Sequence, residues 1–125
     1  MEWDEEKHKL TVGGSAIASS VRKLSDMVPG LYDKEFAKSA DLDQVYYYMH
    51  RDVKKSIDAG KFSQYKRRYD ITVVPPATLG TEFVKTIGHY HELSKAPGHV
   101  SYPELYEVLS GTAHFLLFRR KFEGG

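Results

Sequence analysis

The sequence of 125 residues contains no cysteine. It therefore excludes a disulfide framework, thiolate metal sites and a cysteine nucleophile. No apolar run approaches the roughly 18 residues that a membrane span needs. The acidic stretch 1–6 (Met-Glu-Trp-Asp-Glu-Glu) differs from a secretory signal peptide, which starts basic and then becomes apolar. These absences predict a cytoplasmic protein without membrane contact.

An excess of charge of one sign is missing as well. Eighteen Lys and Arg against seventeen Asp and Glu leave a formal net charge of +1, which argues against a nucleic-acid or anionic-membrane binder. The hydrophobic (41%) and charged (28%) fractions are typical of one globular domain and exclude disordered and fibrous classes. Residues 51–70 are locally basic, and we interpret them as a solvated connector, with a sugar-phosphate or partner contact as the alternative.

Residues 1–40 are expected to form an N-terminal arm, and residues 41–125 the first part of a β-barrel. Apolar residues at positions 17, 21, 24 and 27 recur at helical spacing after a Gly13-Gly14-Ser15 start, and Pro29-Gly30 ends the pattern. This spacing predicts a short amphipathic helix in the arm. An arm that lies extended on the body is the alternative.

From residue 45 onward the sequence favours strands, because β-branched and aromatic residues gather in short runs. The predicted strands are residues 45–49, 71–74, 83–91, 105–109 and 112–118. Pro75-Pro76 must end a strand or lie on an edge. Ser110-Gly111 between two apolar runs is typical of a tight hairpin. The pattern predicts a mainly β protein, an antiparallel sandwich or barrel.

His89 and His91 form the most informative pair for chemistry. On a strand, residues two apart project from the same face, roughly 6.5–7 Å apart along the backbone. Two imidazoles at this spacing can converge on one metal ion. A carboxylate from the next strand completes a His₂-carboxylate set that leaves coordination positions open for a substrate.

Three acidic residues, Glu92, Glu104 and Glu107, compete for the third ligand position. Glu92 has the wrong parity relative to the two histidines. With Ser110-Gly111 as the turn, cross-strand pairing divides the hairpin into two faces. The face of Glu104 otherwise carries Tyr106, Val108, Ala113, Phe115 and Leu117. A carboxylate there costs several kcal/mol unless it is paired or metal-bound, so Glu104 is the preferred ligand.

The remaining candidates have plainer interpretations. Glu107 and His114 fall on the other face of the hairpin and are expected to form an exposed cross-strand pair. His8 lies in a polar terminus, His50 follows the tyrosine run, and His99 lies in a loop. We interpret each of these three as a surface histidine.

Two motifs together resemble a known family. Residues 86–91 (Thr-Ile-Gly-His-Tyr-His) and 102–111 (Tyr-Pro-Glu-Leu-Tyr-Glu-Val-Leu-Ser-Gly) are similar to the first cupin motif of the archaeal-type glucose-6-phosphate isomerases. Residues 47–52 and 68–76 also match stretches typical of that family. The resemblance implies a small cupin (jelly-roll-like) β-barrel, usually a homodimer with one divalent metal ion. Its implied reaction interconverts glucose 6-phosphate and fructose 6-phosphate, a step of glycolysis and gluconeogenesis.

The resemblance also implies roles for particular residues. The metal ligands are His89, His91 and Glu104, with Fe, Mn, Ni or Zn as the ion. The substrate contacts are Thr72, Thr86 and Gly88 at the phosphate, and Tyr102 and Tyr106 beside the sugar. Strand parity places Thr86 and Gly88 opposite the two histidines, so a bulge or phosphate binding through backbone N–H groups is needed.

The sequence departs from the family pattern at its C-terminal end. The family has a fourth metal ligand, a histidine in a second cupin motif, and this sequence reaches Gly125 without such a motif. We therefore expect a barrel that is incomplete at the C-terminus. Uncovered sheet edges and an apolar face predict that two copies associate as a homodimer.

Three functions from different classes stay open at this point. The first is a metal-dependent isomerase, in which Glu104 is either a ligand of the ion that polarises the sugar oxygens or the base that takes the C2 proton. The second is a non-catalytic metal or sugar-phosphate binding fragment, inactivated by truncation. The third is another cupin enzyme, such as a non-haem iron oxygenase.

Overall fold

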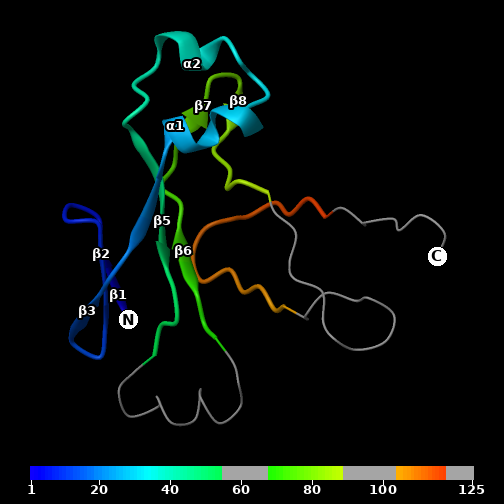
Figure 1. The fold of residues 1–125 in the computed structure, drawn as a ribbon. Coiled ribbons are helices and arrows are strands. Elements are labelled where there is room, and N and C mark those ends of the chain that lie inside the picture. The colour runs from blue at the N-terminus through cyan, green and yellow to red at the C-terminus, as the bar shows by residue number, and fades with distance from the viewer. Residues whose placement is uncertain (55–67, 89–103, 118–125) are drawn as a thin grey trace, which may run out of the picture. The chain divides into compact units, whose positions relative to one another are not determined.

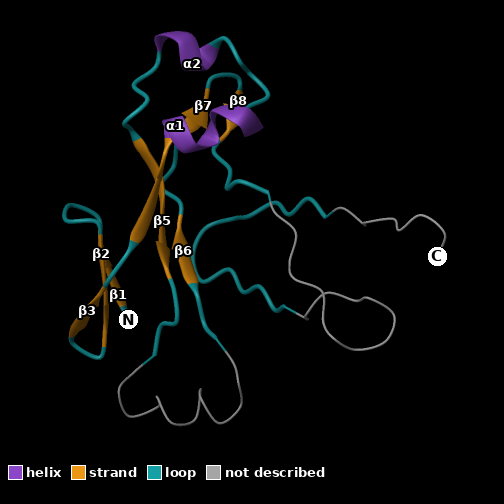
Figure 2. Cartoon of the chain, viewed as in Figure 1, coloured by secondary structure: helices purple, strands orange, loops and turns teal. Residues whose placement is uncertain are grey.

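The computed structural model describes residues 1–54, 68–88 and 104–117. Within these ranges the protein is mainly β, with eight short strands in three antiparallel sheets and no closed barrel (Figures 1 and 2). This confirms the predicted mainly β fold class and is consistent with a cupin-like fold. The chain divides into two compact units, residues 1–88 and 89–125. The predicted boundary between residues 40 and 41 stays a prediction.

Within the described ranges, all the assigned elements lie in the first unit, and each is short. The strands are β1 (Glu2–Asp4), β2 (Lys9–Val12), β3 (Ser15–Ile17), β4 (Ser20–Lys23), β5 (Val45–His50), β6 (Ile71–Val73), β7 (Thr78–Leu79) and β8 (Glu82–Phe83). The helices are α1 (Leu24–Met27), the 3₁₀ turn η1 (Val28–Gly30) and α2 (Phe36–Ser39). No helix in the described ranges has the length and apolar character needed to cross a membrane.

β1, β2 and β3 form an antiparallel meander in which Leu10 pairs with Trp3 on one side and with Ile17 on the other. Gly13 (φ 58°) and Gly14 (φ 81°) lie in the turn between β2 and β3. Positive φ at both turn residues is the type I′ geometry, whose twist matches that of the flanking strands. The two glycines therefore turn a hairpin, and the expectation that they start a helix is wrong.

The predicted helix over positions 17–27 is also largely wrong. Only Leu24–Met27 is helical, as α1. Ile17 lies in β3, and Val21 lies in β4 opposite Tyr48 of β5. Ile17 pairs with Leu10 of β2 and Val21 with a residue of β5, so strand pairing half-buries both side chains and overrides the helical spacing.

β5 is the central strand of the second sheet, with β4 on one side and β6 on the other. Tyr48 pairs with Val21 of β4 and with Val73 of β6. This confirms the strands predicted at residues 45–49 and 71–74. β6 ends before Pro75-Pro76, because proline cannot donate a hydrogen bond to a neighbouring strand.

The three remaining strand predictions fail where the structure describes them. The strand predicted at 83–91 is reduced to Phe83 at the end of β8, and residues 84–88 and 104–117 carry no assigned strand. Gly111 has a φ of 84°, but Ser110 has no positive φ. Two-residue hairpins need a positive φ at the first turn position, whereas positive φ at the second alone belongs to type II turns, which splay the strands. Residues 89–91 and 118 lie outside the described ranges.

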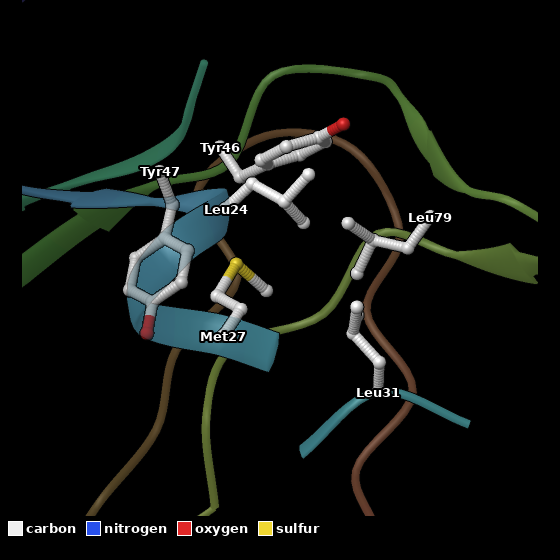
Figure 3. Packing of buried hydrophobic residues seen from close by; sticks show 6 residues of the cluster. All are labelled: Leu24, Met27, Leu31, Tyr46, Tyr47 and Leu79. Carbon is white, nitrogen blue, oxygen red and sulfur yellow. The ribbon is translucent and has the colours of Figure 1, made fainter. Parts of the chain in front are cut away.

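The main hydrophobic cluster joins α1 and β5 to the β7–β8 hairpin. Its buried residues are Leu24, Met27, Leu31, Tyr46, Tyr47 and Leu79 (Figure 3). A second cluster of Leu10, Val53 and Ile71 joins the β1–β3 sheet to β6, with Trp3 and Ile17 packed against it. Segments distant in sequence therefore bury one another in both clusters.

Leu79 tests the main cluster, because its side chain is fully buried (0% exposed). The substitution Leu79→Ala is expected to lower the free energy of unfolding by about 2–5 kcal/mol through lost burial and a new cavity. Leu42→Ala is the matched control, since Leu42 is 45% exposed. Urea denaturation of the three proteins measures the difference, and equal losses in both variants would contradict this account of the core.

Candidate functional site

The structure describes five of the eight residues that the sequence singles out. Thr72 lies on β6, Thr86 and Gly88 follow β8, and Glu104 and Tyr106 lie in the second unit. The predicted ligands His89 and His91 and the predicted sugar contact Tyr102 lie outside the described ranges. All five described residues are exposed to solvent.

Residues 84–88, which lead directly to His89, are tied to the first unit at three points. The Val84 N–H donates to the Ala77 carbonyl (3.2 Å). Lys85 Nζ donates to the Gly30 carbonyl (2.7 Å). The Ile87 N–H donates to the Tyr47 hydroxyl (3.1 Å). Backbone and side-chain contacts thus fix this segment without a strand ladder.

Glu82, two residues before this segment, binds both Tyr32 and Lys85 through its carboxylate. One carboxylate oxygen accepts a hydrogen bond from the Tyr32 N–H (2.8 Å), and the other lies 2.7 Å from Lys85 Nζ. Burial by itself raises the pKa of Glu82. The Lys85 hydrogen bond and charge, together with the backbone N–H donors, outweigh burial and hold the pKa below its ordinary value of 4.5. Glu82 is therefore ionised at neutral pH and joins the β7–β8 hairpin to the loop before α2.

Thr72 lies on the same face of the second sheet as Tyr47. Thr72 pairs with Met49, and cross-strand partners project from one face. Tyr47 and Met49 are two residues apart on β5 and therefore share that face. Since Tyr47 also binds the Ile87 N–H, β5 brings Thr72 and the segment around Ile87 to one side of the sheet.

In the second unit, Glu104 and Tyr106 contact each other directly. The Tyr106 hydroxyl donates to a Glu104 carboxylate oxygen (2.8 Å). The ring of Tyr106 lies 5.3 Å from the ring of Phe115, its predicted cross-strand partner. Tyr106 therefore contacts both of these side chains, which the sequence places on its face of the predicted hairpin, although the described residues form no strand there.

This contact changes the acid–base behaviour of Tyr106. The hydrogen bond to Glu104, partial burial and the negative charge of the carboxylate all raise the pKa of Tyr106 above its ordinary value of 10.0. The phenol therefore keeps its proton at neutral pH. It can donate to the Glu104 carboxylate or to a ligand oxygen.

The other predicted pair of the hairpin is not formed. Glu107 and His114 are both exposed, as expected, but no ion pair joins them in the described part of the chain. No group of three His, Asp or Glu side chains within the described ranges could hold a metal ion. The predicted trio includes His89 and His91, which lie outside those ranges, so it stays a prediction.

His50 corrects the sequence analysis, because it is fully buried (0% exposed) and not a surface histidine. Its Nδ1 lies 3.3 Å from the Ile71 carbonyl, and its Nε2 has no hydrogen-bond partner. Its ring meets the Trp3 ring edge-on at 5.9 Å. The two-residue repeat of a strand places His50 on the same face as Tyr48, and this could be read from the sequence. The Trp3 ring that covers His50 comes from another sheet, so the burial of His50 depends on tertiary packing. We find no role for His50 in the candidate site.

The described ends of the basic segment 51–70 favour the connector interpretation. Asp70 pairs with Arg68 (2.9 Å) and with Arg51 (3.8 Å), and it accepts a hydrogen bond from the Asp52 N–H. These contacts occupy two of the basic side chains that could have bound a phosphate. Residues 55–67, which hold the remaining basic residues apart from Lys54, lie outside the described ranges.

Comparison with known proteins defines the class of the chain. The model of the family described as glucose-6-phosphate isomerase (GPI) matches residues 21–123. The chain therefore belongs to the glucose-6-phosphate isomerase family, which confirms the resemblance seen in its motifs. The match begins in β4, so the β1–β3 sheet precedes it. Neither the curated proteins nor the solved structures gave a match.

Acidification tests the Glu82–Lys85 ion pair. Because folding lowers the pKa of Glu82, the pair stabilises the fold fully above the unfolded pKa near 4.5 and is lost as pH falls through the folded value. Glu82→Gln is expected to cost about 1 kcal/mol of unfolding free energy near pH 7 and much less near pH 3, measured by urea denaturation.

Glu35→Gln provides the matched control, because Glu35 pairs with Lys38 at the surface (side chains 78% and 70% exposed). An exposed pair of this kind contributes little at any pH. If Glu82→Gln lost the same stability near pH 3 as near pH 7, the ion pair would not be the source of its effect.

Proposed function

We propose that this protein is a metal-dependent aldose–ketose isomerase that interconverts glucose 6-phosphate and fructose 6-phosphate. Membership of the glucose-6-phosphate isomerase family over residues 21–123 is the observation that carries the proposal. The contact between Glu104 and Tyr106, two predicted site residues, supports it from the structure. A cytoplasmic location, where sugar phosphates are metabolised, is part of the same proposal.

His89, His91 and Glu104 would hold one divalent ion, Fe, Mn, Ni or Zn. Two imidazoles and a carboxylate are a donor set that these ions accept, and the set leaves positions open for a substrate. A bound ion of this kind acts as a Lewis acid that polarises the neighbouring C1 and C2 oxygens of the sugar.

Tyr106 and Glu104 would act on the sugar itself. The carboxylate of Glu104 can take the proton from C2 if it is not held as a tight metal ligand. Tyr106 orients that carboxylate through its hydroxyl, and its raised pKa keeps the phenol protonated. A neutral phenol can also donate a hydrogen bond to a sugar hydroxyl, whereas a phenolate could not.

In the first unit, Thr72, Thr86 and Gly88 would contact the substrate phosphate. All three are exposed, and two of them supply hydroxyl donors. A Cβ built at Gly88 would meet no atom within 4 Å, so the backbone there is open to a ligand. Open backbone N–H groups are common anion ligands.

Two copies of the chain would form a homodimer through the described part of the second unit. Large apolar side chains are exposed there, including Leu105 (95%), Leu116 (85%) and Leu117 (87%). A soluble monomer rarely leaves such a dense group uncovered, because contact with water is unfavourable for each side chain.

Turnover and metal binding together test the proposed activity. A coupled assay of fructose 6-phosphate conversion with added Mn²⁺, Fe²⁺ or Ni²⁺ is expected to show metal-dependent isomerisation. Glu104→Gln is expected to reduce kcat by roughly 100-fold or more, through loss of the base or of a ligand charge. In isothermal titration of the metal alone, His91→Ala is expected to weaken binding by about 100-fold or more.

The exposed His114 supplies the control, and His114→Ala should change neither turnover nor metal affinity. Metal binding without turnover would replace the isomerase proposal by the non-catalytic binding function. Unchanged metal affinity in His91→Ala would remove the proposed ligand set.

Light scattering coupled to size exclusion tests the homodimer. The expected mass is twice the chain mass of 14.3 kDa. Leu116→Asp should shift the protein toward the monomer, since a charge would enter the apolar contact. Tyr32→Asp is the control at an equally exposed position of the first unit (85%). A monomeric wild type over the micromolar range would contradict the proposal.

A further inference from the structure

The Tyr47 side chain connects the main hydrophobic cluster to residues 84–88, which we call the candidate phosphate segment. Its residue is only 3% exposed, and its ring packs beside Leu24 and Met27 (Figure 3). From this buried position the hydroxyl accepts a hydrogen bond from the backbone N–H of Ile87 at 3.1 Å. Tyr47, a buried residue of β5, thus binds the backbone N–H of a residue that lies 40 positions later in the chain.

Ile87 lies between two of the residues predicted to contact the phosphate. Thr86 and Gly88 are exposed, whereas Ile87 is half-buried and packs against the main cluster. Glycine restricts the backbone less than any other residue, so Gly88 cannot by itself maintain one conformation. The hydrogen bond at Ile87 therefore supplies a constraint that the local sequence lacks.

We propose that Tyr47 is a positioning residue that fixes residues 86–88 for the phosphate of the substrate. This inference rests on the proposed function, but the hydrogen bond that it uses belongs to the first unit alone. Thr72 faces the same side of the sheet as Tyr47, so one residue of β5 sets Thr86 and Gly88 on the side where Thr72 lies. Tyr47 acts through the backbone and does not contact the substrate in this role.

Tyr47→Phe removes the hydroxyl and keeps the buried ring. The exchange of the Ile87 amide hydrogen in the metal-free protein is expected to accelerate by about tenfold or more, because its acceptor is lost. The KM for glucose 6-phosphate is expected to rise by roughly 3- to 10-fold, the equivalent of one hydrogen bond, with kcat within about twofold. A purely structural role would lower thermal stability without this split between KM and kcat.

Tyr46→Phe is the matched control. Tyr46 is equally buried (3% exposed) in the same cluster, and its hydroxyl points in a different direction from that of Tyr47 (Figure 3). Among the described residues, the Tyr46 hydroxyl makes no hydrogen bond to residues 84–88. This variant should leave the Ile87 amide exchange and the KM unchanged.

The two measurements separate the failure of this inference from the failure of the proposed function. Unchanged Ile87 exchange in Tyr47→Phe would overturn the positioning role, whatever the activity. Accelerated exchange with an unchanged KM would overturn its link to the phosphate. Accelerated exchange in Tyr47→Phe, combined with a wild-type protein that shows no isomerase activity, would support the backbone constraint and refute the isomerase proposal.

Discussion

The pairing of β5 with β4 and β6 is the interaction on which the rest of the first unit depends. β5 pairs with β4 along most of its length and with β6 through its last three residues, Tyr48–His50, so backbone hydrogen bonds hold it between two neighbours. Tyr46 and Tyr47 enter the main cluster, whereas the ring of Tyr48 packs against Trp3 of the N-terminal sheet. One six-residue strand therefore connects both hydrophobic clusters, and its tyrosines provide apolar area as well as hydroxyl groups.

Residues 84–88, the candidate phosphate segment, are held by the Tyr47 hydroxyl, by the Lys85 ammonium and by one backbone hydrogen bond, not by a sheet. Residues 84–88 lack a strand ladder, yet backbone, lysine and tyrosine contacts hold them at three points. The Glu82–Lys85 pair is partly shielded from water, which strengthens it relative to an exposed pair. Gly80, with a φ of 69°, permits the hairpin that brings Glu82 to Tyr32, and a Cβ at Gly80 would collide with Asp33.

In the second unit, side chains contact one another although no backbone hydrogen bonds of a β-sheet join their segments in the described residues. Tyr106 contacts both Glu104 and Phe115, the residues that the predicted hairpin pairing places beside it. Its turn has positive φ only at Gly111, a geometry that does not match strand twist. An isolated two-stranded hairpin is also marginal in water without further strands. Leu105, Leu116 and Leu117 of this segment are almost fully exposed.

The β class, the strand at residues 45–49, the end of β6 before Pro75, and the family could all be predicted from the amino-acid sequence. These features follow from local propensity, from proline and from residue identity, which tertiary structure does not alter. Three features became visible only in the folded chain: Val21 lies in a strand, His50 is buried, and Tyr47 binds the Ile87 N–H. Each of these features depends on a partner at least 20 positions away in the chain. The local pattern of apolar and polar residues does not reveal which distant residue will be that partner.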